Sequence, residues 1–273
     1  MERLTYYSNE LPTEADSATK FALSADWPAE GKIELKNLNL KYDEHLPLVL
    51  SGVSLTILPG EKIGVVGRTG SGKSSLMLAL YRIIEPCGGS ILIDGVDTKS
   101  LGLRDLRTRM AIIPQDPVLF NGSVRFNLDP FDQHTDEEIW SCIERSGIKH
   151  VVFAMEDGLD SPIATGGENL SIGQRQLFCL ARALIKESKI VILDECTANV
   201  DMETDEMVQK CLRTDFAKST VLAIAHRLDT IMDYDRILLL DHGSVVEFDS
   251  PTNLLQRQDS AFHKLYRESH TIK

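Results

Sequence analysis

Residues 67–74 have the types and spacing of a phosphate-binding loop. They are, in order, Gly67, Arg68, Thr69, Gly70, Ser71, Gly72, Lys73 and Ser74, which fits the pattern GxxxxGK[ST]. Glycines let such a backbone wrap with its N–H groups turned inward, so that an anion is held at the start of a helix. Lys73 would then reach the β- and γ-phosphates of a nucleotide, Ser74 would coordinate Mg²⁺, and Ser75 would make a further phosphate contact. The alternative is a glycine-rich turn that merely precedes a lysine.

A second candidate group is the pair of carboxylates Asp194 and Glu195, which directly follow the apolar run at 190–193. Such a run predicts a buried parallel strand, and ligands of an open α/β sheet bind beyond the carboxyl ends of its strands. There Asp194 would hold Mg²⁺, directly or through water, and Glu195 would face the attacking water as general base. In isolation the same pair is also typical of two solvated acids, so the interpretation depends on the loop at 67–74.

Apolar patterning predicts the elements that would position these residues. Residues 33–40 alternate between apolar and polar side chains, which is typical of a half-buried strand. Further strands are expected at 49–57, 63–66, 190–193, 221–224 and 237–240, and an amphipathic helix at 77–84. A polar section rich in helix formers runs from about 116 to 182. Strands separated by helix-length segments indicate an α/β fold with a parallel sheet and a helical insertion.

Length, charge and cysteine usage narrow the class of protein. The chain has 273 residues, enough for one or two domains, and a net charge of −12 from 41 acidic and 29 basic residues. Proteins that grip nucleic acid non-specifically are usually basic, so nucleic acid is not expected as a partner. No run approaches the roughly 18 apolar residues of a membrane span. The five cysteines are odd in number and form no CxxC pair, which favours a reducing compartment without disulfides or a zinc site.

The segment Leu170, Ser171, Ile172, Gly173, Gln174 resembles LSGGQ, the signature of the ATP-binding cassette (ABC) ATPases. Further matches follow in that family's order over nearly the whole chain, from about residue 31. They are Tyr42 (the aromatic that stacks on adenine), Gln115 (the Q-loop contact to Mg²⁺ and water), Asp194 with Glu195 (Walker B), Asp201 (the D-loop) and His226 (the switch histidine at the γ-phosphate). Each residue alone has an ordinary structural explanation, such as a helix N-cap at Ser171. The occurrence of all these matches in the family's order favours membership of the family.

The resemblance implies the P-loop NTPase fold of the ABC ATPases, with a parallel-sheet core, an antiparallel β subdomain and a helical subdomain at about 116–182. It implies ATP and Mg²⁺ as cofactors. The catalytic residues would be Lys73, Gln115, Glu195 and His226; the metal ligands Ser74, Gln115 and Asp194; and the nucleotide contacts Tyr42, residues 67–75, Ser171, Gly173, Gln174 and Asp201.

The signature residues would serve a second cassette. Ser171 and the Gly173 amide begin a helix, where a hydroxyl, N–H donors and the positive dipole suit a phosphate. In the family this surface closes over the ATP held by a partner's phosphate loop, so that two cassettes sandwich two ATP molecules. An isolated domain would therefore be mostly monomeric and incomplete.

Three neighbouring segments resemble the second cassette of subfamily C, the multidrug resistance-associated protein type of exporter. They are residues 125–130, 166–171 and 225–233. Residues 1–30 resemble a linker that leaves a preceding membrane domain, which leaves 31–273 as the ATPase domain. The resemblance implies a location at the cytoplasmic face of a membrane, with a first cassette and membrane domains of the same transporter as partners.

The sequence departs from the family signature at one position, and two other kinds of ABC protein are alternatives to an exporter. Ile172 replaces a glycine of the signature, and a β-branched residue should stiffen that loop. Because Glu195 is intact, this cassette's own ATP would lie in the hydrolytic site, while its signature would close a site that hydrolyses poorly. A regulatory cassette of a subfamily C channel or receptor has the same site residues and stays open. A chromosome-type ABC ATPase is disfavoured, since only about 55 residues separate Gln115 from Leu170, too few for coiled-coil insertions.

Overall fold

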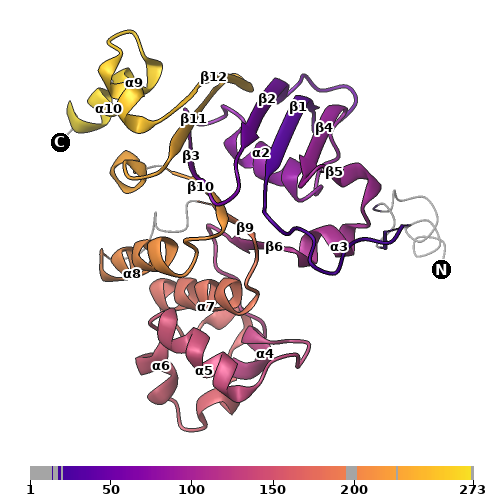
Figure 1. Cartoon of the computed structure of the whole chain (residues 1–273). Helices are drawn as coiled ribbons and strands as arrows, with labels where there is room; N and C mark the ends of the chain where they lie inside the picture. Colours follow the sequence, from indigo (N-terminus) through magenta and orange to yellow (C-terminus); the bar gives the residue numbers. More distant parts are fainter. Residues whose placement is uncertain (1–13, 15–17, 20, 195–201, 226, 272–273) are drawn as a thin grey trace.

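The computed structural model describes residues 14, 18–19, 21–194, 202–225 and 227–271 of the chain. Glu195, Asp201 and His226, which the sequence singled out, lie outside these ranges. Figure 1 shows two sheets, a helical lobe below them, and a C-terminal pair of helices, α9 (Pro251–Gln256) and α10 (Ala261–Thr271), at the opposite end from the lobe.

The central sheet has the strand order β12–β11–β3–β10–β9–β6. Its strands are β3 (Lys62–Val66), β6 (Met110–Ile113), β9 (Ile190–Asp194), β10 (Thr220–Ile224), β11 (Arg236–Asp241) and β12 (Ser244–Asp249). The strands from β11 to β6 pair in parallel, and β12 pairs antiparallel with β11. Nearly every residue of β3, β9 and β10 is buried, as expected of strands covered on both faces. The predicted parallel-sheet core is confirmed.

An antiparallel sheet packs beside this core, with the order β2–β1–β4–β5. Its strands are β1 (Ile33–Leu40), β2 (Leu50–Ile57), β4 (Gly88–Ile93) and β5 (Val96–Asp97). Ile33, Leu35, Leu38 and Leu40 are buried and the polar residues of β1 are at least partly exposed, as the sequence predicted, although the alternation breaks at Lys36 and Asn37, where the register shifts. β4 and β5 were not predicted.

The helical lobe contains α4 (Val124–Leu128), α5 (Asp136–Arg145), α6 (Lys149–Phe153) and α7 (Ile172–Ile185) (Figure 1). A short ribbon of β7 (Gly122–Ser123) and β8 (Pro162–Ile163) completes it. Nearly every residue of α7 from Gln176 to Ile185 is buried, and the helix also contacts α8 (Met202–Thr214), which links the lobe to the core. Over the described residues, no helix combines the length and the apolar character needed to cross a membrane.

The remaining elements are short. They are α3 (Leu103–Thr108) and the 3₁₀ turns Thr98–Ser100, Gly158–Asp160, Thr165–Gly167 and Leu228–Ile231.

Helix α2 (Lys73–Leu80) follows the glycine-rich loop, and the prediction of a helix at 77–84 was wrong at both ends. Its first turn is polar, so apolar periodicity could not reveal it. Its end is set by Arg82, whose backbone takes a φ of 49° in the left-handed region. The Arg82 guanidinium is buried and donates to the carbonyls of Thr98 and Leu101, both at 2.7 Å. These bonds hold a conformation that a helix could not contain.

The packed part of the chain reaches back before β1. Trp27 is only 5% exposed, and its Nε1 donates to the carbonyl of Ile93 over 3.1 Å. The carboxylate of Asp94 accepts hydrogen bonds from the backbone N–H groups of residues 30–32. The segment that precedes β1 is therefore fastened to the turn after β4.

Replacing Trp27 by alanine is expected to lower the free energy of unfolding by about 3–5 kcal/mol, because it leaves a cavity in the core. Urea unfolding followed by circular dichroism measures the change. Phe131→Ala, at a side chain that is 74% exposed, is the control and should change stability by less than about 0.5 kcal/mol. A Trp27→Ala chain as stable as the parent would show that this segment lies outside the cooperative core.

Candidate nucleotide-binding site

The loop at 67–74 closes so tightly that two of its positions require glycine. Gly67 has a φ of 151°, and a Cβ there would lie 2.2 Å from the carbonyl oxygen of Leu240. Gly72 has a φ of 104°, and a Cβ would lie 2.7 Å from Cδ2 of Leu50. Both contacts are shorter than any real Cβ contact, so the backbone itself approaches its neighbours. The predicted role of these glycines in a tight, backbone-lined loop thus has a steric basis.

Lys73 lies inside this loop. Its side chain is 7% exposed, and Nζ donates to the carbonyl oxygens of Gly67 at 2.9 Å and Arg68 at 3.2 Å. Helix α2 has no side-chain cap at Gly72 and no acidic residue in its first turn. A buried ammonium and an uncapped helix N-terminus therefore concentrate positive potential at one place, which suits a phosphate.

A hairpin that the sequence did not single out braces the loop. The N–H of Gly243, in the turn between β11 and β12, donates to the Ser71 carbonyl at 3.0 Å, and the Gly243 carbonyl accepts from Ser51 N–H at 2.8 Å. A Cβ on Gly243 would lie 2.2 Å from the carbonyl oxygen of Val49. The hairpin thus joins the loop to the antiparallel sheet. The sequence signal for this hairpin is a His-Gly pair between apolar runs. Such a pair predicts a turn but not the segments that the turn contacts.

Strand register brings the segments that carry Asp194 and Gln115 to the same edge of the central sheet. Ile224 at the end of β10 pairs with Val65 of β3 on one side and with Asp194 of β9 on the other. Ile113 at the end of β6 pairs with Leu193, so Gln115 follows β6 beside Asp194. Because these strands are parallel, their carboxyl ends share one edge with the loop after β3.

The donor set at this edge fits Mg²⁺. Ser74 lies exposed on the first turn of α2, Gln115 is exposed after β6, and Asp194 is half-buried at the end of β9. A hydroxyl, an amide oxygen and a carboxylate are the hard oxygen ligands that this ion prefers.

Tyr42 and Ser75 contact one another. Tyr42 lies in the loop after β1, is 52% exposed, and its hydroxyl is 2.9 Å from Oγ of Ser75. An exposed aromatic ring beside the phosphate loop is what a base-stacking role requires. The Ser75 hydroxyl is thus bonded to the tyrosine, and the predicted phosphate contact of Ser75 stays a prediction.

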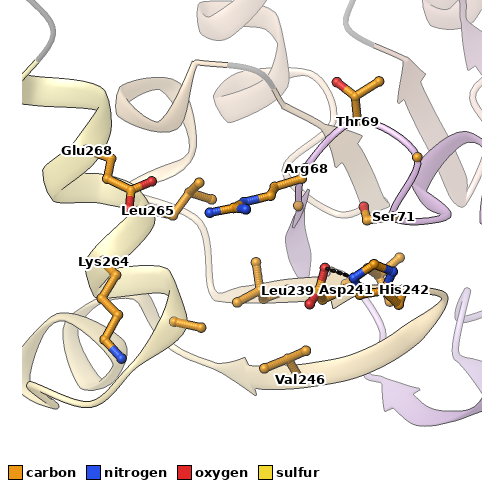
Figure 2. A pocket seen from close by; sticks show the side chains of 14 residues that line it. Arg68, Thr69, Ser71, Leu239, Asp241, His242, Val246, Lys264, Leu265 and Glu268 are labelled. Carbon is orange, nitrogen blue, oxygen red and sulfur yellow. Dashed lines mark ion pairs between the residues drawn. The ribbon is translucent and has the colours of Figure 1, made fainter.

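The backbone and the side chain of Arg68 have different surroundings. Its carbonyl accepts from Lys73, but its side chain extends away from the loop toward Leu265 and Glu268 of α10 (Figure 2). It enters a groove of about 510 Å³ between the loop, the β11–β12 hairpin and α10. Apolar side chains of Leu239 and Val246 also line this groove. The backbone of Arg68 therefore forms part of the loop at 67–74, while its side chain lines this groove.

The structure does not bring the signature residues to this loop. Ser171 caps α7 in the helical lobe, where its hydroxyl accepts from Gln174 N–H at 3.1 Å and Gln174 Oε1 accepts from Ser171 N–H at 2.9 Å. This reciprocal capping box confirms the helix start, with Gly173 buried and Ile172 46% exposed. Figure 1 places α7 in the lobe and α2 beside the antiparallel sheet.

Side chains of α7 instead hold the segment that carries Gln115. Nε2 of Gln176 donates to the Pro114 carbonyl at 3.1 Å. The guanidinium of Arg182 donates to the Val118 carbonyl and to Oδ1 of Asn127, both at 2.7 Å. Burial lowers the pKa of Arg182, yet these acceptors keep the charge hydrogen-bonded. The signature helix and the Q-loop segment are thus one packed unit, a link between distant residues that no local pattern reveals.

The comparisons with known proteins agree with this architecture. The sequence model of the ABC transporter family matches residues 50–198. ATP-binding cassette sub-family C member 2 of Rattus norvegicus is 50% identical over 98% of this chain and 17% of its own length. ABC transporter C family member 8 of Dictyostelium discoideum is 51% identical over the same shares.

A solved structure extends the similarity to the fold. The structure of a bacterial Atm1-family ABC exporter with ATP bound matches with a TM-score of 0.88 and 29% identity, over 98% of this chain and 46% of that one. The chain spans 17% of the length of the two curated relatives. The chain belongs to the ABC transporter family, as a cassette of its subfamily C.

Proposed function

We propose that this chain binds and hydrolyses ATP as one cassette of a larger subfamily C exporter, and that the reaction powers export across a membrane. The observation that carries the proposal is the loop at 67–74, with its buried ammonium and uncapped helix start. The relatives named as ATP-binding cassettes and the exporter structure with ATP bound support it.

Lys73 would exchange its hydrogen bonds to the carbonyls of Gly67 and Arg68 for bonds to the β- and γ-phosphates. The backbone N–H groups at the start of α2 would hold the same oxygens. Ser74, Asp194 and Gln115 would hold Mg²⁺, which when bound neutralises charge that develops on the phosphates. Glu195 would accept the proton of the water that attacks the γ-phosphorus, and His226 would contact the γ-phosphate. ADP and phosphate are the products.

The signature residues would act on a second ATP. Ser171 and Ile172 are exposed at the start of α7, so a partner cassette can reach them. Since Ser171, Gly173 and Gln174 lie in a different lobe from Lys73, one chain would supply half of each of two sites. The first cassette of the same transporter is the proposed partner, with Asp201 adding a nucleotide contact, residues 1–30 leading from a membrane domain, and residues 31–273 at the cytoplasmic face.

Lys73→Ala is expected to weaken binding of MgATP to this chain by on the order of 100-fold, because charge-assisted hydrogen bonds to phosphate are lost. Isothermal titration calorimetry measures the affinity. Lys99→Ala, at an exposed lysine, is the matched control and should bind like the parent. Unchanged affinity in Lys73→Ala would contradict the assignment of residues 67–74 as a phosphate-binding loop.

Glu195→Gln is expected to slow hydrolysis in the full transporter by about 10² to 10⁴-fold while ATP binding survives, because the amide keeps the shape but not the base. Asp194→Asn should instead weaken the Mg²⁺ dependence of binding. Single-turnover hydrolysis and nucleotide trapping separate the two effects. Hydrolysis by Glu195→Gln at the parent rate would exclude Glu195 as the base.

The isolated chain is expected to be mostly monomeric and to hydrolyse ATP slowly, because a partner signature is missing. The rate per chain should rise when the matching first cassette is added. Without the first cassette, Ile172→Gly should raise the rate at concentrations where two copies of this chain pair, since each copy then closes the other's site with a signature that lacks the branched side chain. Phosphate release measured beside analytical ultracentrifugation tests this, and fast turnover independent of concentration would contradict it.

A further inference from the structure

The ring of Tyr42 is not enclosed by its surroundings. Its side chain is half exposed, and it lies in a connecting loop between β1 and β2. The loop backbone is ordered at its base by Val49 N–H donating to the Leu40 carbonyl at 2.7 Å. That bond leaves the χ angles of Tyr42 free. An exposed aromatic side chain would otherwise sample several rotamers, and fixing it costs conformational free energy.

Ser75 supplies the missing restraint. It is 5% exposed in the first turn of α2, two residues after Lys73, and its Oγ lies 2.9 Å from the Tyr42 hydroxyl. The first backbone bond of α2 in the loop region runs from Leu76 N–H to the Gly72 carbonyl at 2.9 Å. The backbone N–H of Ser75 precedes that bond and stays at the helix N-terminus, where a phosphate would bind under the proposed function. Ser75 would thus offer its backbone to the phosphates and its hydroxyl to the ring.

We propose that Ser75 is a positioning residue that fixes the ring of Tyr42 relative to the phosphate loop, so that the base and the triphosphate of a nucleotide are recognised together. The inference rests on the proposed function and names a role for Ser75 beyond it. Because α2 is the helix that carries Lys73, a ring tied to α2 keeps a constant distance from the phosphate site. A pre-placed ring binds a base without the loss of rotamer freedom that a mobile ring incurs.

The alternative role for the Ser75 hydroxyl is a direct hydrogen bond to phosphate. The two roles differ in which ligands they would help to bind. A positioning hydroxyl affects ligands that carry a base and works only through the Tyr42 hydroxyl. A phosphate-binding hydroxyl affects inorganic polyphosphate as strongly as ATP, whatever residue stands at 42.

The test is a double-mutant cycle with Tyr42→Phe, Ser75→Ala and the double variant, titrated with MgATP and with magnesium tripolyphosphate. Each single variant should weaken MgATP binding about three- to tenfold, the range expected for one hydrogen bond. The double variant should lose no more than either single one, and tripolyphosphate affinity should stay within twofold. Tyr42→Trp retains a stacking ring without the hydroxyl, so Ser75→Ala in that background should change nothing. Thermal unfolding of every variant checks the fold.

Additive losses in the double variant would overturn the inference, because the two hydroxyls would then act independently. Equal losses for tripolyphosphate and MgATP in Ser75→Ala would overturn it in favour of a direct phosphate contact. Tripolyphosphate binding by the parent without preference for MgATP would show that no ring is positioned over a base. Failure of the parent to bind either ligand overturns the proposed function itself, and the inference with it.

Discussion

The structure depends on the loop at 67–74, which surrounds the ammonium group of Lys73. At its glycines, the backbone of this loop packs directly against neighbouring segments, with no room for a side chain. Gly67 leaves no room for a Cβ beside the carbonyl of Leu240, and Lys73 turns its Nζ back onto the loop carbonyls. Those carbonyls hold the charge in a buried position. Under the proposed function, Lys73 would exchange these backbone acceptors for phosphate oxygens.

The elements around the loop serve this constraint in different ways. Parallel pairing of β3, β10, β9 and β6 brings the segments after each strand to one edge. The β11–β12 hairpin supports the loop from behind through Gly243. The helical lobe carries the signature on α7, and Gln176 and Arg182 fasten that helix to the segment around Gln115. Under the proposed function, a movement of the segment around Gln115 would therefore also move α7, which carries the signature surface that faces the partner cassette.

The sequence predicted the features that depend on residues close together in the chain. Strand β1 was predicted to the residue because its inward positions are apolar and its outward positions polar. The loop at 67–74 and the helix start at Ser171 were predicted because glycine, lysine and N-cap residues have fixed positions in such motifs; the reciprocal bond to the Gln174 side chain that completes the cap was not predicted. β4 was missed because it begins with Gly88 and Gly89 and only Ile91 and Ile93 are buried. β12 was missed because its residues are mostly half exposed, without a clear period.

What depends on contacts between distant residues could not be predicted. The side chain of Arg68 belongs to a loop motif, yet it lies against α10, which is nearly two hundred residues away in the chain. The hydroxyls of Ser75 and Tyr42 are hydrogen-bonded although the residues lie 33 positions apart in the chain. Both features concern side-chain direction, which the tertiary packing decides and the motif does not.

The most direct test of the central claim is a crystal structure of this chain with Mg²⁺ and a non-hydrolysable ATP analogue. The triphosphate should lie inside the loop at 67–74, with Lys73 Nζ within hydrogen-bond distance of its terminal oxygens and the adenine against Tyr42. The side chain of Arg68 should remain in the groove beside α10. A triphosphate bound elsewhere, for instance on Arg68 in that groove, with Lys73 still bonded to the carbonyls of Gly67 and Arg68, would contradict the account.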